Sequence, residues 1–189
     1  VEGVNLNNLL SVEPKPRNPL LADAFKRIGL AERTGRGVDV IFEGLLRYGR
    51  PAPDYSRSDK TIVVVSFSTA KADIAFMQMV LMEEKHSSLP ISLDTLLILS
   101  RLRHERRISS IEASQALQKD EQVSRIVLER LVENGLIEAH GIKKGRIYTL
   151  SARLYQQMGQ DTHYVRQTGF EPIQQEQMIL RYVDTYGQI

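Results

Sequence analysis

The stretch that decides the fold runs from Ser92 to Leu150 and reads SLDTLLILSRLRHERRISSIEASQALQKDEQVSRIVLERLVENGLIEAHGIKKGRIYTL. Its first part carries leucines at helical spacing and ends in the charged residues 103–107. This pattern predicts an amphipathic helix with a cationic last turn, the polarity that a helix dipole favours. Ile108-Ser109 then predicts a short extended piece, and we expect Ser110 to cap a second helix.

The second part of this stretch predicts a third helix and a hairpin. A turn at residues 118–121 precedes the helix, and Asn134-Gly135 ends it. The apolar positions that predict its buried face are Val123, Ile126, Val127, Leu128, Leu131 and Val132. The hairpin has expected strands at Leu136–Ala139 and Arg146–Leu150, joined by a glycine-bounded tip. This order of elements resembles a winged helix-turn-helix, a fold that binds DNA.

The resemblance implies which residues would face DNA. In a helix-turn-helix the second helix of the motif lies in the major groove, with its N-terminal residues at the base edges. Here that helix starts near Glu121, and its expected outward positions are Gln122, Ser124, Arg125, Glu129 and Glu133. We expect Gln122 to pair with adenine, Arg125 with guanine or phosphate, and Ser124 and Lys119 with phosphate. A second cationic cluster lies at the hairpin and consists of Lys143, Lys144 and Arg146. We expect this cluster to contact the phosphate backbone of double-stranded DNA.

Other uses of the same surface remain open. Arg125 and Glu129 are four residues apart on a helix and could simply pair on a solvated face. The carboxylates of Glu121, Glu129 and Glu133 would repel phosphate. A winged helix can also serve protein contacts or dimerisation, and this alternative predicts an apolar outer surface on the third helix.

A second resemblance concerns residues 16–55, PRNPLLADAFKRIGLAERTGRGVDVIFEGLLRYGRPAPDY. The residues that carry it are Arg17-Asn18-Pro19, Glu32, Gly35-Arg36-Gly37 and Pro53. The segment resembles the distal part of the GHKL-like ATP-binding domain of bacterial transcriptional regulators and RecG-type helicase-related proteins. In such proteins a Schlafen-type AlbA domain typically precedes this domain and winged helices follow it. The resemblance covers about residues 1–70 and implies ATP as a ligand of the full-length parent.

The glycine pair of this segment is a candidate phosphate site. The loop Arg33, Thr34, Gly35, Arg36 and Gly37 precedes an expected helix, whose N-terminal amides favour an anion. The alternative is a helix-helix turn that needs a positive φ. The Asp-x-Gly-x-Gly loop of GHKL domains is missing from this sequence. We therefore expect no cofactor in this fragment, and the enzyme question stays open, with a nucleotide-dependent, helicase-related enzyme as an alternative function.

The flanking segments complete the expected architecture. Helices are predicted at 20–30, from the glycine pair to Tyr48-Gly49, at 71–87, and from Ser151 to Gly159; Thr61–Phe67 is the most β-prone run. The fold class is α+β, a partial GHKL-like ATPase region followed by a winged helix-turn-helix. We expect three parts: residues 1–70, residues 71–159, and a linker with the start of a second winged helix at 160–189. The chain is expected to be a fragment of a longer parent.

Composition excludes several classes of site. The chain has no cysteine and its four histidines are dispersed, so we expect no metal site and no catalytic residues. It has no long apolar run and no signal-peptide pattern, which predicts a cytoplasmic protein without a membrane partner. Its net charge of +2 does not argue for nucleic acid, so that case depends on local clusters. We expect the truncated N-terminal region to pack on the winged helix or to be covered by a partner chain, so homo-oligomerisation could use either part.

Overall fold

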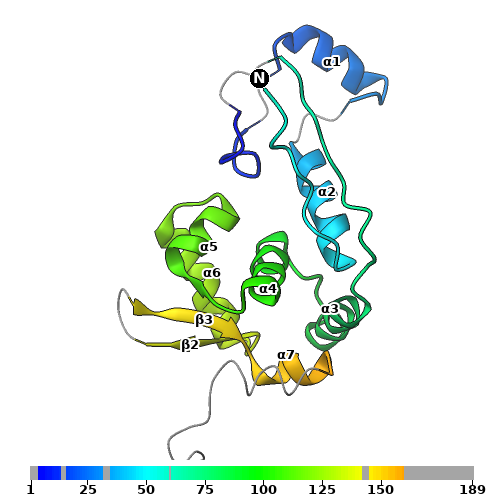
Figure 1. Ribbon diagram of the computed structural model, residues 1–189. Coiled ribbons are helices and arrows are strands. Elements are labelled where there is room, and N and C mark those ends of the chain that lie inside the picture. The colour runs from blue at the N-terminus through cyan, green and yellow to red at the C-terminus, as the bar shows by residue number, and fades with distance from the viewer. Residues whose placement is uncertain (1–3, 14–15, 32–34, 60, 142–144, 160–189) are drawn as a thin grey trace, which may run out of the picture.

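The winged helix-turn-helix arrangement predicted for residues 92–150 is present in the computed structural model, which describes residues 4–13, 16–31, 35–59, 61–141 and 145–159 (Figure 1). Three antiparallel strands form a sheet in the order β1-β3-β2, with Ile108 opposite Tyr148 and Ile137 opposite Leu150. We call this part the winged-helix unit, and its elements are α4 (Leu93–Glu105), β1 (Ile108–Ser109), α5 (Ser110–Leu117), α6 (Glu121–Glu133), β2 (Ile137–His140) and β3 (Ile147–Leu150).

Side-chain caps set where these helices begin. Ser92 caps α4 and Asp120 caps α6, each by accepting a hydrogen bond from a backbone amide of the first turn. The predicted cap of α5 was wrong by one residue, because Ser109 and Glu112 form a capping box. Backbone and side-chain hydrogen bonds from Ser109 lower the pKa of the Glu112 carboxyl. Ser110 instead donates its hydroxyl to Glu121 at 3.1 Å.

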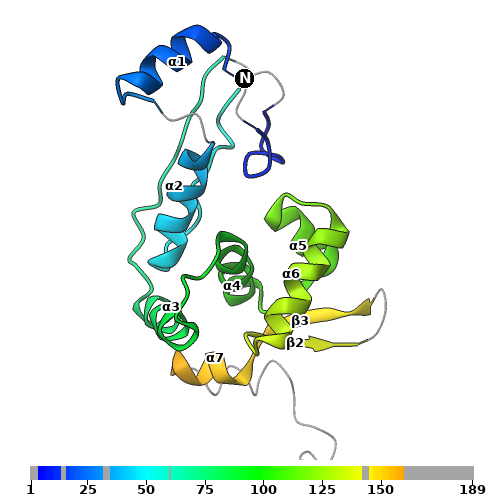
Figure 2. The same ribbon diagram turned by 180° about the vertical axis from the view of Figure 1, so that it is seen from behind.

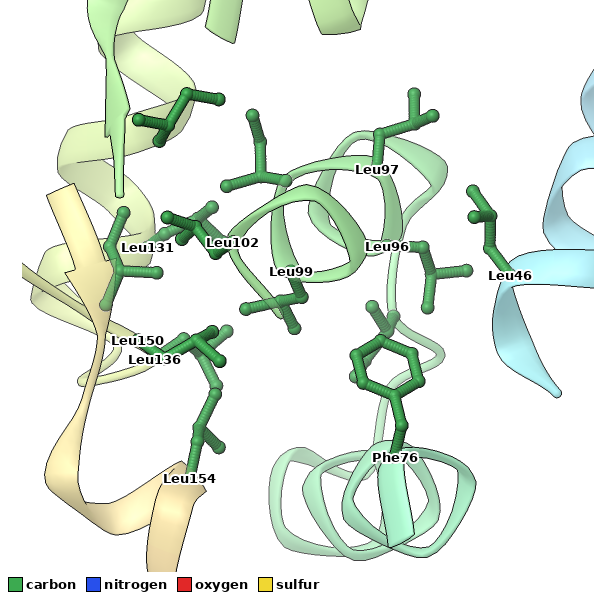
Figure 3. Packing of buried hydrophobic residues seen from close by; sticks show 14 of the residues in the cluster. Leu46, Phe76, Leu96, Leu97, Leu99, Leu102, Leu131, Leu136, Leu150 and Leu154 are labelled. Carbon is green, nitrogen blue, oxygen red and sulfur yellow. The ribbon is translucent and has the colours of Figure 1, made fainter. Parts of the chain in front are cut away.

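The helix α4 lies at the centre of the hydrophobic core, because its leucines are buried on more than one side. Leu96, Leu99 and Leu102 are inaccessible to solvent. On one side Leu96 faces Leu46 of α2 (Arg36–Arg47) and Phe76 of α3 (Ile74–Ser87) (Figure 3). On the other side α4 faces residues from α6, the turn before β2, β3 and α7 (Ala152–Gln157), which are Leu131, Leu136, Leu150 and Leu154.

Of the two described helices in the N-terminal region, α2 packs into this core and α1 does not. Phe42 and Leu46 of α2, with Tyr55 of the following loop, belong to the same buried cluster as the winged-helix unit. The helix α1 (Pro19–Arg27) buries none of its residues and lies away from the winged-helix unit (Figures 1 and 2). The packing expected between the N-terminal region and the winged helix is therefore present at α2. The domain boundary at residue 70 stays a prediction.

The β-prone run at residues 61–67 does not form a strand. Its ladder contacts among the described residues are limited to an isolated bridge between Ser66 and Asp54. A strand needs a neighbour along its length, and the side chains of Ile62, Val63 and Phe67 stay exposed here. High β propensity was therefore a poor guide to this segment.

The helices predicted on either side of the winged helix are both present. Asp73 caps α3 and Ser151 caps α7, and the two helices pack against each other. Met79 of α3 is buried, as expected for a methionine that fills the core. Within the described part of the chain, no helix has the length and hydropathy needed to cross a bilayer. The predicted second winged helix at 160–189 lies outside the described residues.

Candidate nucleic-acid interface

The outer face of α6 presents two of the polar residues that were predicted to meet DNA. Gln122 and Arg125 are exposed in the first two turns of the helix. Asp120 lies in the connection between α5 and α6 and caps α6 by accepting a hydrogen bond from the Val123 amide. The helix-turn-helix geometry expected around Gln122 and Arg125 is therefore present.

The predicted outward position of Ser124 was wrong. Its side chain is fully buried, with 0% exposure. The buried stripe of α6 consists of Ser124, Leu128 and Leu131, which follow one another at helical spacing and face the core. Contact with the neighbouring helices thus determines which face of α6 is buried. Ser124 is buried because it lies on the same face as Leu128 and Leu131. A phosphate cannot reach Ser124 without unfolding this contact.

Two residues predicted to be buried in α6 are instead on its surface. Val123 is 41% exposed and Ile126 is 60% exposed, and Ile111 of α5 is 58% exposed. The apolar positions of α6 are more numerous than the core can accept, because the stripe through Leu128 takes only one side of the helix. Exposed apolar groups therefore lie on α6 beside Gln122 and Arg125. This is the apolar outer surface that the protein-contact alternative predicts.

Each predicted DNA-binding cation that the structure describes has a carboxylate partner. Lys119 Nζ lies 2.6 Å from Asp94 Oδ2, and Arg125 Nη2 lies 2.6 Å from Glu121 Oε1. Arg146 Nη1 lies 2.9 Å from Glu129 Oε1. The pair weighed from the sequence, Arg125 with Glu129, is replaced by two others, because the hairpin brings Arg146 to Glu129. Formal charge cancels within these three pairs.

The ion pair of Glu129 links the hairpin to α6. Glu129 also accepts a hydrogen bond from the Tyr148 hydroxyl at 3.0 Å, and the Arg146 guanidinium lies 5.4 Å from the centre of the Tyr148 ring. Burial is the largest cause that raises the pKa of the Tyr148 hydroxyl, and the hydrogen bond to Glu129 is the next largest. Residues of α6 and β3 therefore form one connected cluster. The predicted wing residues Lys143 and Lys144 lie outside the described residues.

Glu121, Arg125 and Glu129 lie on one face of α6, because they are spaced by four residues. Arg146 extends the same line from the hairpin through its contact with Glu129. We call these four residues the charged stripe. It places a cation of α6 and a cation of the hairpin on one side of the winged-helix unit.

The ion pairs of the charged stripe are weak enough to exchange partners. The Arg125 and Glu121 side chains are 54% and 43% exposed, and pairs at such exposure contribute roughly 0–1 kcal/mol. A phosphate oxygen accepts the same hydrogen bonds from arginine as a carboxylate does. The stripe can therefore release its arginines to a polyanion, while its carboxylates reduce the net attraction.

The second candidate site, the glycine pair before α2, has the geometry of a turn. Gly35 precedes α2 with φ of 74°, which favours glycine, and no side chain caps this helix. Gly37 is inside the helix, and a Cβ there would meet nothing within 4 Å. The alternative of a helix-helix turn accounts for Gly35, and Arg36 is the first residue of the helix. Arg33 and Thr34 lie outside the described residues.

The described part of this loop does not show the crowded cradle that close approach of a phosphate would require of Gly37. Close approach of a phosphate would explain a glycine in a crowded cradle, but Gly37 faces open space. The part of the chain that the structure describes also has no group of three or more acidic, histidine or cysteine side chains placed to hold a metal ion.

Comparison with known proteins gives a family match for the N-terminal region. Residues 1–66 match the family described as "Putative ATP-dependent DNA helicase recG C-terminal". This match supports the ATPase-like family for that region, in agreement with the resemblance carried by Gly35-Arg36-Gly37. No curated protein matches the chain.

Among solved structures, the DIP2311 protein from Corynebacterium diphtheriae is similar over 83% of this chain, with a TM-score of 0.64 and 19% identity. The chain spans 32% of that protein, so the likeness shows the fold of a part of it. MarR from Staphylococcus aureus, in complex with salicylate and kanamycin, covers 57% of the chain and 77% of its own length at a TM-score of 0.33 and 22% identity. Oxidised MarR from E. coli covers 58% of the chain and 88% of its own length at a TM-score of 0.30 and 22% identity. The TM-scores of the two MarR structures are too low to support a conclusion about this chain.

Proposed function

We propose that the winged-helix unit binds double-stranded DNA as part of a bacterial cytoplasmic transcriptional regulator. The observation that carries this proposal is the charged stripe, which aligns Arg125 of α6 with Arg146 of the hairpin through Glu129. A duplex that accepts α6 in its major groove has phosphates on both sides of that groove. A helix and a hairpin on one side of the protein can therefore reach base edges and backbone together.

Binding would proceed by exchange of ionic partners. Arg125 leaves Glu121 for a phosphate or a guanine edge, and Gln122, one residue into the helix, reaches an adenine edge. Arg146 leaves Glu129 for the adjacent backbone, and Lys119 leaves Asp94. Each exchange releases counterions from the DNA, which makes the affinity depend on salt. The released carboxylates oppose binding, so we expect modest affinity from these residues.

Replacing Arg125 by glutamine tests this proposal. We expect the variant to bind a random duplex about tenfold more weakly, because one good arginine contact contributes roughly 1–3 kcal/mol. The matched control is Arg57→Gln, which removes the same charge from an exposed position in the loop after α2. Both affinities are measured by fluorescence anisotropy with the labelled duplex. Equal affinity of the Arg125 and Arg57 variants would exclude α6 from the interface.

A second function, contact with protein, is favoured by the exposed apolar side chains of α5 and α6. Ile126, Val123 and Ile111 together place branched apolar groups on the outer surface. On this alternative the winged-helix unit dimerises, the wild-type chain sediments as a dimer, and Ile126→Glu sediments as a monomer. Duplex affinity would then be absent at low salt, which separates the two functions.

The N-terminal region adds a proposal about the full-length parent. The family match of residues 1–66 supports an ATPase-like domain and also fits the helicase-related alternative. We propose that ATP binds only in the parent, because this sequence lacks the Asp-x-Gly-x-Gly loop of GHKL domains. Isothermal titration of the full-length protein with ATP, and with this chain alone, would separate these cases. ATP binding by this chain alone would contradict the proposal.

A further inference from the structure

We propose that residues 4–13, which we call the strap, act as an autoinhibitory cover on the turn of the helix-turn-helix. This inference rests on the proposed DNA-binding function and concerns its regulation. The strap lies beside the end of α5 in both views, although it is more than a hundred positions away in the sequence (Figures 1 and 2). A strap in this position crowds the approach of a duplex to Lys119 and the turn before α6, although Gln122 and Arg125 stay exposed.

The side chain of Gln118 hydrogen-bonds the strap to the turn. The Leu10 amide donates a hydrogen bond to Gln118 Oε1 at 2.8 Å, and Gln118 Nε2 donates to the Leu6 carbonyl at 2.9 Å. Within the strap, the Asn5 amide donates to Asn8 Oδ1 at 2.7 Å, so the loop has a defined shape. Leu9 and Leu10 are partly buried against the hydrophobic core. The amide group of Gln118 thus uses both its donor and its acceptor on the strap.

Gln118 occupies the position where strap and DNA would meet. It is the C-cap of α5, with φ of 53°, and it directly precedes Lys119 and the N-cap Asp120 of α6. The residues that would contact phosphate and base at this end are Lys119 and Gln122. A segment bound to Gln118 therefore lies next to the path by which a duplex approaches α6.

The strap offers nothing that a phosphate would bind strongly. Its described residues include no lysine or arginine, and Glu13 adds a negative charge at its end. It therefore covers the turn without adding a cation to the interface. Its hold is also weak enough to open, because two neutral hydrogen bonds and two partly buried leucines contribute little net stability.

Two variants release the strap in different ways. Gln118→Gly removes both hydrogen bonds without adding backbone strain, because glycine accepts the positive φ at this position. Leu10→Asp leaves the turn unchanged and places a charge where an apolar side chain packs. The control is Gln115→Ala, an exposed glutamine of α5 without a role in the strap contact. Circular dichroism checks that all three variants keep the helical fold.

The measurements are hydrogen exchange of the Leu10 amide and affinity for a random duplex at fixed salt. We expect the Leu10 amide to exchange faster in both release variants. We also expect both variants to bind the duplex about tenfold more tightly, because the strap contact that stabilises the inhibited state contributes about as much as two hydrogen bonds. Addition of saturating duplex should also speed this exchange in the wild-type chain. The control should match the wild type in both measurements.

Three results would overturn the inference. Unchanged Leu10 exchange in Gln118→Gly would mean that the strap contact is absent in solution. Faster exchange with equal or weaker duplex affinity would mean that the strap does not inhibit binding. Faster exchange with no duplex binding by any variant would overturn the proposed function itself, and the inhibitory role with it.

Discussion

Replacing Phe76 by alanine should lower the free energy of unfolding by about 3–4 kcal/mol, as expected when a large core side chain is truncated. Phe76 is 1% exposed and points from α3 toward α4, next to Leu46 of α2 and Leu96 (Figure 3). It also lies 5.5 Å below the guanidinium of Arg103, which pairs with Asp73 at the start of α3. The substitution therefore opens a cavity where three helices meet.

The measurement is thermal unfolding followed by circular dichroism. The transition should move down by about 10 °C, since 1 kcal/mol corresponds to roughly 2–4 °C in a chain of this size. Met82→Ala on the same helix is the control, because Met82 is 51% exposed and should change the midpoint little. A shift equal to that of the control would mean that α3 does not pack on the winged-helix unit.

Replacing Arg153 by methionine should cost about 2–3 kcal/mol, because it leaves a buried carboxylate without its ionic partner. Glu83 of α3 is 6% exposed and accepts hydrogen bonds from both terminal nitrogens of Arg153, at 2.8 and 2.9 Å. The expected cost is below that of a fully buried pair because the Arg153 side chain is 39% exposed. Arg153 also contacts the carbonyls of Asn134 and Gly135 at the end of α6, so its loss loosens that end too.

A double-substitution cycle separates the ion pair from simple packing. Glu83→Gln removes the charge and keeps the shape, and Glu83→Gln with Arg153→Met should recover part of the lost stability. Gln157, which donates to Glu83 at 2.8 Å, remains as a partner in all variants. Chemical denaturation gives the four free energies of unfolding. Strict additivity of the two substitutions would show that the charges do not interact.

The elements of the winged-helix unit could be predicted because their signals are local. Asp120 and Asn134-Gly135 bracket α6, and the residues near Gly141 and Gly145 separate β2 from β3. The predicted turn at residues 118–121 and the predicted stop at Asn134-Gly135 are both present, and Asp120 within that turn is the cap of α6, since these roles depend on backbone geometry within a few positions. The location of α6 as the exposed second helix of the motif follows from this order.

The surface of α6 could not be predicted because it depends on contacts from distant parts of the chain. Ser124 is buried, while Val123 and Ile126 are exposed, because α4 and α5 cover only the side that carries Leu128. The ion pair of Glu129 with Arg146 requires the hairpin to fold back on the helix. The link from Gln118 to Leu6 and Leu10 crosses most of the chain, and no sequence pattern indicates it.

The N-terminal region shows a further limit of local signals. The run at residues 61–67 has the highest β propensity in the chain, but the side chains of Ile62, Val63 and Phe67 are exposed, and its ladder contact among the described residues is one isolated bridge to Asp54. Propensity describes how well a residue fits a sheet surface, and without neighbouring strands there is no such surface. By contrast, the resemblance of residues 16–55 to an ATPase-like family agrees with the family match over residues 1–66.

The salt dependence of duplex binding tests most directly whether the charged stripe and the hairpin contact DNA. If Arg125, Arg146 and Lys119 together neutralise three phosphates, the affinity of the whole chain for a random duplex should fall about fortyfold between roughly 50 and 200 mM salt. The Arg125→Gln variant should show a shallower slope, because it neutralises about one phosphate fewer. An affinity that is absent at the lower salt concentration, or that does not change with salt, would contradict DNA binding by this surface.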